Sequence, residues 1–396
     1  MNFNEIKALD QSYVLQTYGR NQVAISHGKG ATIWDTEGRE YVDFTSGIGV
    51  CALGYANDKW AKAIYDQAMK VAHISNLFFT EPYAKLAEKL IKGSGMTGGV
   101  FFGNSGAEAN EGMIKLARKY SFEKYGKDRG TIITLTNSFH GRTITTLEAT
   151  GQDKFHNYFF PFTEGFRYAA ANDIDAVIAA GGDDVCGVMI ELIQGEGGVN
   201  PLDYDFVQAV AKLCQEKDWL LLLDEVQTGI GRTGSLFAFQ QFDISPDVVT
   251  FAKGIGGGLP MGGFLTSEKC RNVLRAGDHG STFGGNPVAA AGAGVVLDTL
   301  TAELLDEVKV KGEYIRNTIA SFNSPYVTGI RGMGLMIGVG IKGMTHVEMK
   351  DKLMAEGLLA LTAGKDTLRL LPPLTISMEE IDKGLAIMKK VMKVEE

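Results

Sequence analysis

WLLLLDEVQTG, residues 219–229, decides the fold class of this 396-residue chain. Four leucines in succession predict a strand that is buried on both faces, as in a parallel sheet covered by helices on either side. The strand ends on two carboxylates, Asp224 and Glu225. Because a desolvated carboxylate without a partner is unfavourable, we expect a cationic group to meet the acid at this strand end.

Short apolar runs alternate with helix-like stretches over residues 51–300. This alternation predicts an α/β domain with a mostly parallel sheet and helices on both faces. Ligands of such sheets bind at the carboxyl ends of the strands, where Asp224 lies. Besides the strand at 219–225, the strand candidates are GVFFGN (99–104), TIITL (131–135), VCGVMIEL (185–192) and VVTFAK (248–253), and helices are expected over 107–120 and 203–218.

The two ends of the chain have a different pattern. Residues 1–50 form an N-terminal segment with a strand–turn–strand signal at ATIWDTEGREYVDF (31–44). Residues 301–396 are expected to form a smaller α+β domain, with strands in 329–340 and 366–371 and a helix that Ser377 caps. The predicted organisation is a large domain over 51–300 with a small C-terminal domain after it.

The composition is typical of a globular protein, with 45% hydrophobic and 22% charged residues. A net charge of −8 does not favour nucleic acid or an anionic membrane as a partner. The chain has no apolar run long enough to span a membrane and no secretion signal, which predicts a cytoplasmic protein. The four cysteines have no metal-ligand spacing, so no metal site is predicted.

The motif GNSGAEAN (103–110) follows a strand and begins a helix near Ala107. Backbone N–H groups at such a helix start bind phosphate, and Ser105, Gly106 and Ala107 are the residues concerned. The same pattern also occurs in simple helix capping. Taken alone, the motif therefore leaves both interpretations open.

Two further motifs follow strand ends. SFHGRT (138–143) offers the Phe139 ring for stacking and the Arg142 guanidinium for a carboxylate; core packing and a surface ion pair are the competing interpretations. Lys253 ends the strand at 248–253. A desolvated lysine amine is a nucleophile toward aldehydes, unless the side chain extends to solvent.

Taken together, these groups suit pyridoxal 5'-phosphate. The set comprises a phosphate-binding helix start, a stacking ring, a buried acid and a lysine at the next strand end. Asp224 would keep the pyridine nitrogen protonated, so that the ring withdraws electrons from the substrate. The cationic partner expected for this acid would then belong to the cofactor.

Six segments resemble the motifs of the class III (fold type I) pyridoxal-phosphate aminotransferases, in that family's order over residues 13–374. They are GNSGAEANEGMIKLAR, NSFHGRT, ELIQGEGGV, LLLDEVQTGIGRTG, FAKGIGGGLPMG and GSTFGGNP. The resemblance implies that Lys253 bonds the cofactor and shuttles a proton, that Asp224 is the second catalytic residue, and that Gln227 contacts the ring hydroxyl. The cofactor-binding set that it implies is Ser105, Gly106, Ala107, Phe139, His140, Asp224, Glu225, Val226, Gln227, Lys253 and Thr282. Thr282 would reach the cofactor of a neighbouring subunit, which implies a homodimer with shared active sites.

The resemblance also implies a set of substrate-binding residues, with Arg142 and Arg369 as carboxylate-binding arginines. The remaining members of this set are Tyr18, Ile48, Glu191, Glu196 and Ser281. Ornithine δ-aminotransferases carry a tyrosine where this chain has Ile48. An apolar residue there favours a donor whose α-amine is blocked.

The activity that follows is transamination between N2-acetylornithine and 2-oxoglutarate, a reaction of arginine biosynthesis. Succinylornithine, ornithine and 4-aminobutyrate compete with acetylornithine as the amino donor. An aminomutase or a decarboxylase on the same scaffold, and a catalytically inactive ligand-binding protein, are the competing functions. Two carboxylate-binding arginines favour a second, acceptor substrate, and the presence of Lys253 and Asp224 disfavours the inactive protein.

Overall fold

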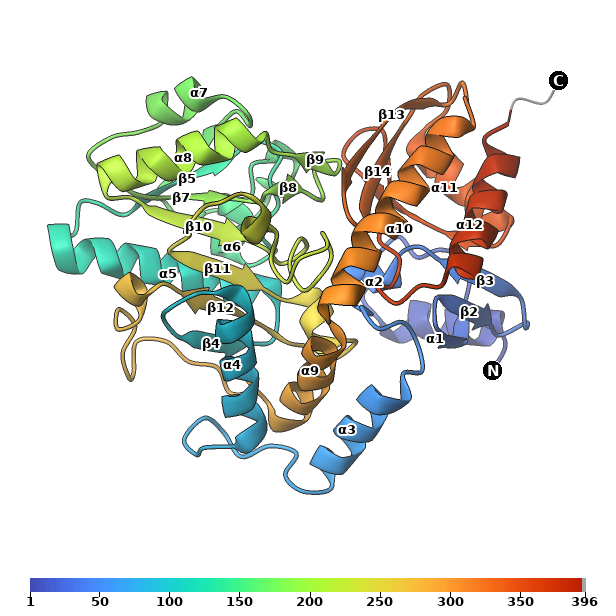
Figure 1. Ribbon diagram of the computed structural model, residues 1–396, viewed down its shortest axis with the longest axis horizontal. Coiled ribbons are helices and arrows are strands. Elements are labelled where there is room, and N and C mark those ends of the chain that lie inside the picture. The colour runs from blue at the N-terminus through green and yellow to red at the C-terminus, as the bar shows by residue number, and fades with distance from the viewer. Residues whose placement is uncertain (394–396) are drawn as a thin grey trace.

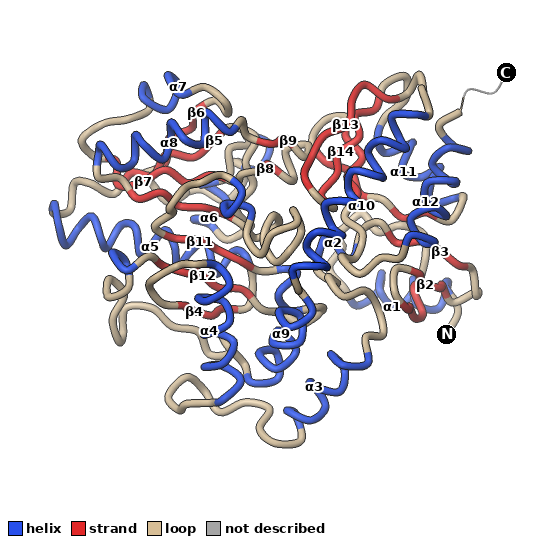
Figure 2. The backbone as a smooth tube through the Cα atoms, in the orientation of Figure 1, coloured by secondary structure: helices blue, strands red, loops and turns tan. Residues whose placement is uncertain are grey.

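The computed structural model describes residues 1–393 of the chain. Two lobes are visible in Figure 1: one surrounds a seven-stranded sheet, and the other joins the N-terminal strands to the C-terminal helices and strands. Figure 2 shows α10 (Ala302–Ser321) leading from α9 (Pro287–Thr299), beside the large lobe, into the smaller one.

The seven-stranded sheet has β10 (Leu220–Asp224) near its centre, parallel to its neighbours β7 (Val185–Ile190) and β11 (Val248–Phe251). Only β12 (Gly262–Thr266) runs antiparallel to the strands on either side of it. The predicted mostly parallel α/β sheet is therefore confirmed. The strand order is β4 (Val100–Gly103), β12, β11, β10, β7, β5 (Thr131–Leu135) and β6 (Phe166–Ala169).

The four leucines of β10 explain why this strand is central. Leu220 and Leu222 pack into a core cluster that includes residues of α5 (Gly106–Tyr125), whereas Leu221 and Leu223 pack into the cluster that includes residues of α8 (Tyr204–Lys217). Successive side chains of a strand point to opposite faces, so both faces of β10 must be apolar. The expectation of a strand buried on both faces is confirmed.

The smaller lobe contains the antiparallel sheet β13 (Val327–Met333), β14 (Met336–Ile341), β17 (Thr367–Leu370) and β16 (Leu361–Ala363). Its helices are α10, α11 (His346–Ala355) and α12 (Met378–Val391), and Ser377 caps α12 as predicted. A second sheet joins the chain ends, because β15 (Leu358–Leu359) pairs with β3 (Glu40–Asp43), beside β2 (Thr32–Asp35) and β1 (Ile25–Lys29). Val42 and Phe44 accordingly share one core with residues of α10, α11 and α12.

The remaining elements are short or peripheral. They are α1 (Phe3–Tyr13), α2 (Ser46–Gly49), α3 (Asp58–Ala68), α4 (Glu81–Ser94), α6 (Ile144–Ala149), α7 (Ile174–Ala179), β8 (Ile193–Gln194) and β9 (Asn200–Pro201). Among residues 1–393 no single helix is both long and apolar enough to cross a membrane; α9 and α10 pass the same test only as a pair, with a 73° bend between them.

Candidate active site

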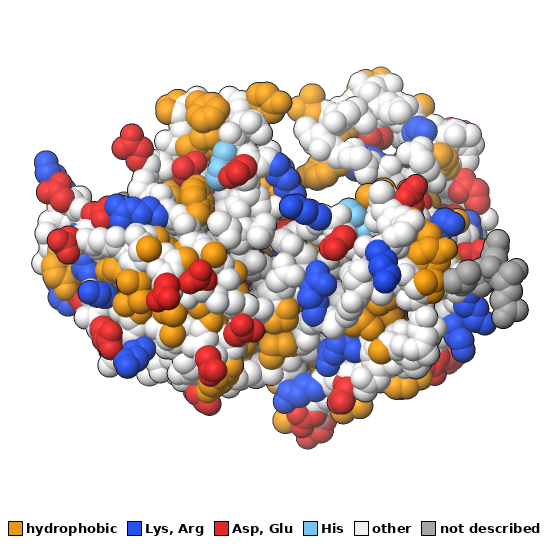
Figure 3. Space-filling view, turned by 90° about the horizontal axis from the view of Figure 1, so that it is seen from above, with side chains coloured by type: hydrophobic (Ala, Val, Ile, Leu, Met, Phe, Trp, Pro, Cys, Tyr) orange, Lys and Arg blue, Asp and Glu red, His pale blue; other side chains and the backbone are white. Residues whose placement is uncertain are grey.

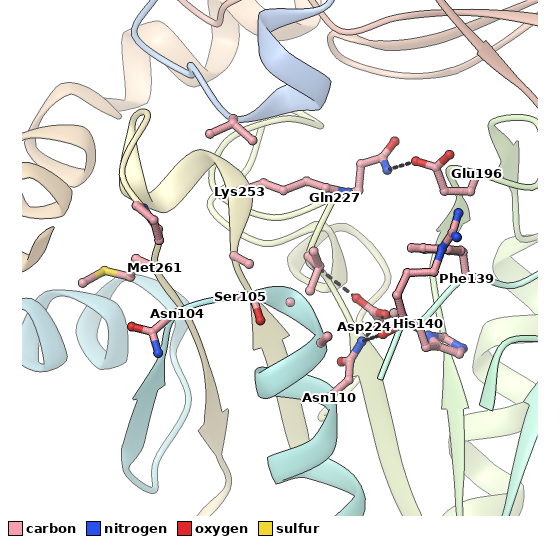
Figure 4. Close-up of a pocket in the computed structure, with 18 of the residues that line it drawn as sticks. Asn104, Ser105, Asn110, Phe139, His140, Glu196, Asp224, Gln227, Lys253 and Met261 are labelled. Atoms are coloured by element: carbon pink, nitrogen blue, oxygen red, sulfur yellow. Dashed lines mark hydrogen bonds and ion pairs between the residues drawn. The ribbon is translucent and has the colours of Figure 1, made fainter. Parts of the chain in front are cut away.

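A cavity of about 630 Å³ lies at the carboxyl ends of the central strands (Figure 4). It brings together most of the residues that the sequence singled out. The predicted residues that line it are Tyr18, Ser105, Gly106, Ala107, Phe139, His140, Arg142, Glu191, Glu196, Asp224, Val226, Gln227 and Lys253.

Asp224 is the buried acid at the end of β10, with 4% of its surface exposed. Its Oδ2 accepts hydrogen bonds from Asn110 Nδ2 and His140 Nδ1, each at 2.8 Å, and its Oδ1 accepts the Val226 N–H at 3.0 Å. These donors come from α5, from the loop after β5 and from the turn after β10. They fix the orientation of the carboxylate at the cavity wall, which is what a partner for a positively charged ligand atom requires.

Asn110 lines the cavity and contacts Asp224, although the sequence analysis did not identify it. Besides Asp224, its Nδ2 donates to the His140 carbonyl at 2.7 Å, and its Oδ1 accepts the Thr250 hydroxyl at 2.9 Å. It lies in the second turn of α5, on the face turned toward the sheet. The only signal in the sequence was an asparagine on the apolar face of a predicted helix. An amide buried on such a face needs polar partners, which indicates a specific contact.

Lys253 follows β11 and adopts a left-handed backbone conformation with φ of +47°. Figure 4 shows its side chain extending across the cavity toward Gln227. Desolvation lowers the pKa of the Lys253 amine, and Glu196 is the carboxylate that opposes this shift most strongly. Burial therefore favours the neutral amine, the form that attacks an aldehyde.

The start of α5 forms a concave backbone surface beside these groups. Ser105 caps the helix by accepting the Glu108 N–H at 3.2 Å, and the N–H groups of Gly106 and Ala107 have no partner within the helix. A Cβ at Gly106 would lie 2.7 Å from Val226 Cγ1, so this position excludes a side chain. Free amides at the positive end of a 20-residue helix suit a phosphate group.

Phe139 and Arg142 lie at the open side of the cavity. The Phe139 ring meets Phe155 edge-on at 5.9 Å, and the Arg142 guanidinium lies 4.4 Å from the centre of the Phe155 ring. Arg142 is exposed, and within residues 1–393 it has no ion pair. Its guanidinium is therefore available to a carboxylate at the entrance of the cavity.

Glu191 is a second buried acid of the cavity, beyond the end of β7. Its carboxylate accepts the Phe139 N–H at 2.8 Å and the Gly195 N–H at 3.3 Å, so it holds the loop that carries Phe139. Burial raises the pKa of Glu191 to about 7. The geometry gives this residue a role in shaping the wall of the cavity.

Glu196 and Arg369 form a bidentate ion pair between the two lobes. Arg369 NH1 and NH2 donate to the two carboxylate oxygens at 2.5 and 3.1 Å, and NH1 also donates to Gln227 Oε1 at 3.1 Å. Burial, the largest single influence, raises the pKa of Glu196, but the charge and hydrogen bonds of Arg369, the Lys253 charge and the Gln227 hydrogen bond together lower it below its ordinary value. The buried Arg369 Nε has no partner among residues 1–393, so this guanidinium retains an unused donor.

Five predicted site residues do not line this cavity. Ile48 is 43% exposed and lies outside it, and Arg369 borders it only through Glu196 and Gln227. Ser281 accepts a hydrogen bond from Asn104, which does line the cavity. Thr282 lies in an exposed loop near a different, small pocket of the same chain.

Glu225 is the fifth of these residues, and its side chain does not face the cavity. Its carboxylate turns away from the cavity into the core and accepts the N–H groups of Ala238 and Phe239 at 2.6 and 2.8 Å and the Thr228 hydroxyl at 3.1 Å. Alternation along the strand causes this, because adjacent residues face opposite sides. Burial raises the pKa of Glu225 to about 7. The side chain anchors the loop after β10 and does not line the cavity.

A family model described as "Aminotransferase class-III" matches residues 14–392 of the chain. Acetylornithine aminotransferase of Haemophilus ducreyi is 52% identical over 99% of both chains, and that of Caldanaerobacter subterraneus subsp. tengcongensis is 45% identical over 97% of this chain and 98% of that protein.

Two solved structures are also similar to this chain. N-acetylornithine aminotransferase from Stenotrophomonas maltophilia superposes with a TM-score of 0.83 and 38% identity, covering 97% of each chain. Ornithine aminotransferase from Toxoplasma gondii superposes with a TM-score of 0.94 and 32% identity, covering 99% of this chain and 95% of that one.

Proposed function

The chain belongs to the class-III aminotransferases, and we propose that it transfers the terminal amino group of N2-acetylornithine to 2-oxoglutarate. The products are N-acetylglutamate 5-semialdehyde and glutamate, and the reaction belongs to arginine biosynthesis. The observation that carries this proposal is the meeting of Asp224, Lys253 and the free amides of α5 in one cavity. The acetylornithine aminotransferases among its relatives support the choice of donor.

Pyridoxal 5'-phosphate, the cofactor of this family, supplies a protonated aromatic ring that withdraws electrons from a bonded substrate carbon. The residues present fit it, because they provide a helix start that excludes a side chain at Gly106 and an acid fixed by three donors. In the proposed arrangement the amides of Gly106 and Ala107 bind the phosphate and Phe139 stacks on the ring. Asp224 holds the proton on the ring nitrogen.

Lys253 has two tasks in this arrangement. Its amine would hold the cofactor through the aldehyde carbon, and the same amine, when free, would accept a proton from the substrate carbon and return it. Desolvation lowers the pKa of this amine, which favours both tasks near neutral pH. Gln227, which lies beside Lys253 in Figure 4, would contact the ring hydroxyl.

The two arginines bind the carboxylates of different substrates. Arg142 at the entrance binds the α-carboxylate of acetylornithine, whose terminal amine then reaches the centre of the cavity. Glutamate must present its α-carbon instead, so a second carboxylate site is needed near that carbon. Arg369 provides this site when Glu196 releases the guanidinium. The ion pair thus masks Arg369 during the half-reaction of the donor. Tyr18, which lines the cavity with 73% of its surface exposed, would contact the donor.

The proposal includes a homodimer. Thr282 lies outside the cavity of its own chain, in an exposed loop next to Phe283, and Phe78 and Phe79 are also strongly exposed. Large exposed apolar side chains of this kind mark protein interfaces. Positive and negative side chains are interspersed on the face shown in Figure 3, so this face does not carry charge of a single sign of the kind that attracts nucleic acid. The proposal keeps small-molecule substrates and a cytoplasmic location, with no nucleic-acid or membrane partner.

A panel of amino donors tests this function. The purified protein, saturated with pyridoxal phosphate, is assayed with 2-oxoglutarate and with acetylornithine, succinylornithine, ornithine or 4-aminobutyrate, and glutamate formation is measured. We expect the highest kcat/KM with acetylornithine, and no turnover by Lys253→Ala. A tenfold or greater preference for ornithine would overturn the assignment, because it corresponds to about 1.4 kcal/mol in favour of a free α-amine.

A further inference from the structure

Residues 195–200, named here the Glu196 loop, join β8 to β9 of the large lobe but are held by the small lobe. Apart from the ion pair with Arg369, the Glu196 carbonyl accepts the Gly364 N–H at 2.9 Å. The loop contains three glycines, Gly195, Gly197 and Gly198, so its backbone has little intrinsic rigidity. Its position must come from contacts with neighbouring elements.

Arg331 on β13 makes three hydrogen bonds to this loop. Its Nε and NH2 donate to the Gly198 carbonyl at 3.0 and 2.6 Å, and Nε also donates to Asn200 Oδ1 at 3.0 Å. NH2 donates in addition to the Thr367 hydroxyl at 2.7 Å. This half-buried guanidinium lies outside the main cavity and has no ion pair among residues 1–393, so its donors serve the backbone of the loop.

The register of the small sheet aligns Arg331 with Arg369. Arg331 pairs with Gly338 on β14, and Gly338 pairs with Arg369 on β17, so the two arginines project from one face of the sheet. A Cβ at Gly338 would lie 2.8 Å from Val199 Cβ. The glycine between the arginines therefore lets the loop backbone rest directly on the sheet, with one guanidinium on each side.

We propose that Arg331 is a positioning residue that keeps the Glu196 loop docked while the Glu196–Arg369 ion pair opens and closes. The inference rests on the proposed function, since it assigns to Arg331 the control of how fully Arg369 is masked. The hydrogen bonds of Arg331 go to the backbone and to Asn200, so they persist when Glu196 releases Arg369. Without these hydrogen bonds the loop moves away from the small sheet, and the Glu196 carboxylate pairs with Arg369 for less of the time. The rate of the glutamate half-reaction then rises relative to that of the acetylornithine half-reaction.

Arg331→Met, Arg331→Lys and the control Arg316→Met test this role in the holoenzyme. Arg316 is a second half-buried arginine of the small lobe that donates to a main-chain carbonyl, that of Gly334 at 3.2 Å, with no contact to the Glu196 loop. Two quantities are measured. One is hydrogen exchange of the amides of residues 195–200 and of Gly364, and the other is the ratio of single-turnover rates with acetylornithine and with glutamate.

For Arg331→Met we expect exchange of these amides to rise and the acetylornithine-to-glutamate ratio to fall, each by roughly tenfold, the effect of about one lost charged hydrogen bond. Arg331→Lys should give intermediate values, because an ammonium reaches the Gly198 carbonyl without the fork that also bonds Asn200. Arg316→Met should leave both quantities unchanged.

Unchanged exchange in Arg331→Met, or faster exchange with an unchanged ratio, overturns the proposal. So does an Arg316→Met variant that reproduces both effects. If the wild type shows no half-reaction with acetylornithine, the proposed function fails. Hydrogen exchange then decides by itself whether Arg331 holds the loop.

Discussion

Asp224→Asn replaces the acid at the end of β10 by an amide of the same shape. The carboxylate accepts three hydrogen bonds, from Asn110, His140 and the Val226 N–H. An amide has one oxygen, so its NH2 group must face either the Val226 N–H or the pair formed by Asn110 and His140. One unsatisfied donor of this kind costs about 1–3 kcal/mol of stability. The melting temperature should therefore fall by no more than roughly 10 °C, and the fold should persist.

The effect on catalysis should be larger than the effect on folding. Asn cannot hold a proton on the ring nitrogen of the cofactor, because it lacks the negative charge. Losing a charge-assisted hydrogen bond at the reacting group costs about 3 kcal/mol in the barrier, which corresponds to a rate roughly a hundredfold lower. We expect this loss in single-turnover rates with acetylornithine, while the bound cofactor is retained.

Asp247→Asn is the matched control. Asp247 directly precedes β11, at the amino-terminal ends of the strands and therefore at the end of the sheet away from the cavity. It accepts the Leu221 N–H at 3.0 Å. Its replacement should lower the melting temperature similarly and leave the rates unchanged. An Asp224→Asn enzyme within about threefold of the wild-type rate, under 1 kcal/mol, would refute the role of Asp224.

Borohydride reduction of the holoenzyme should place a pyridoxyl group on Lys253 in peptide maps, and label on another lysine would exclude it as the attachment point. Mixed dimers of Lys253→Ala and Thr282→Ala chains should regain activity under subunit exchange; if they stay inactive, or if the enzyme is an active monomer, the shared site is wrong. Glu196→Ala should speed the glutamate half-reaction relative to that of acetylornithine by about tenfold, since masking is worth about 1–3 kcal/mol, and an unchanged ratio would remove Glu196 from the mechanism. Burial raises the pKa of Glu225 from 4.5 to about 7, so the folded state binds the proton more tightly and the contribution of this group to stability declines as the pH rises through that window. Glu225→Gln should lack this decline in urea unfolding between pH 5 and pH 7, and an identical slope would contradict the shift.

The central sheet was predictable where a strand carries its own signal. The apolar run at Leu220–Asp224 has the composition that burial on both faces requires, and its two core clusters confirm the pattern. β12 (Gly262–Thr266) was missed because its GGFLT sequence begins with two glycines, which weaken a strand signal. In the structure a Cβ at Gly263 would lie 2.1 Å from the Phe101 carbonyl oxygen. That glycine reflects a close approach of neighbouring backbone, which the sequence does not display.

Contacts between distant parts of the chain could not be predicted from sequence patterns. β15 completes the sheet of the N-terminal strands, pairing Leu358 with Val42 across more than three hundred residues. The partners of Arg331 likewise come from segments far apart in sequence, including Gly198 and Thr367. Local periodicity predicts which elements exist, but it contains no information on which distant backbone carbonyl a guanidinium will reach.

The two acids after the four leucines show how one strand serves both folding and chemistry. Period-two alternation sends Asp224 to the cavity and Glu225 to the core, so the pair cannot share a function. Glu225 is bonded mainly by backbone N–H groups, and burial raises its pKa to about 7, which shows that these donors do not fully offset desolvation. Asp224 instead has the side chains of Asn110 and His140 directed at it from outside the strand. The two neighbouring acids are therefore held differently, Asp224 by side-chain donors from other elements and Glu225 mainly by backbone N–H groups.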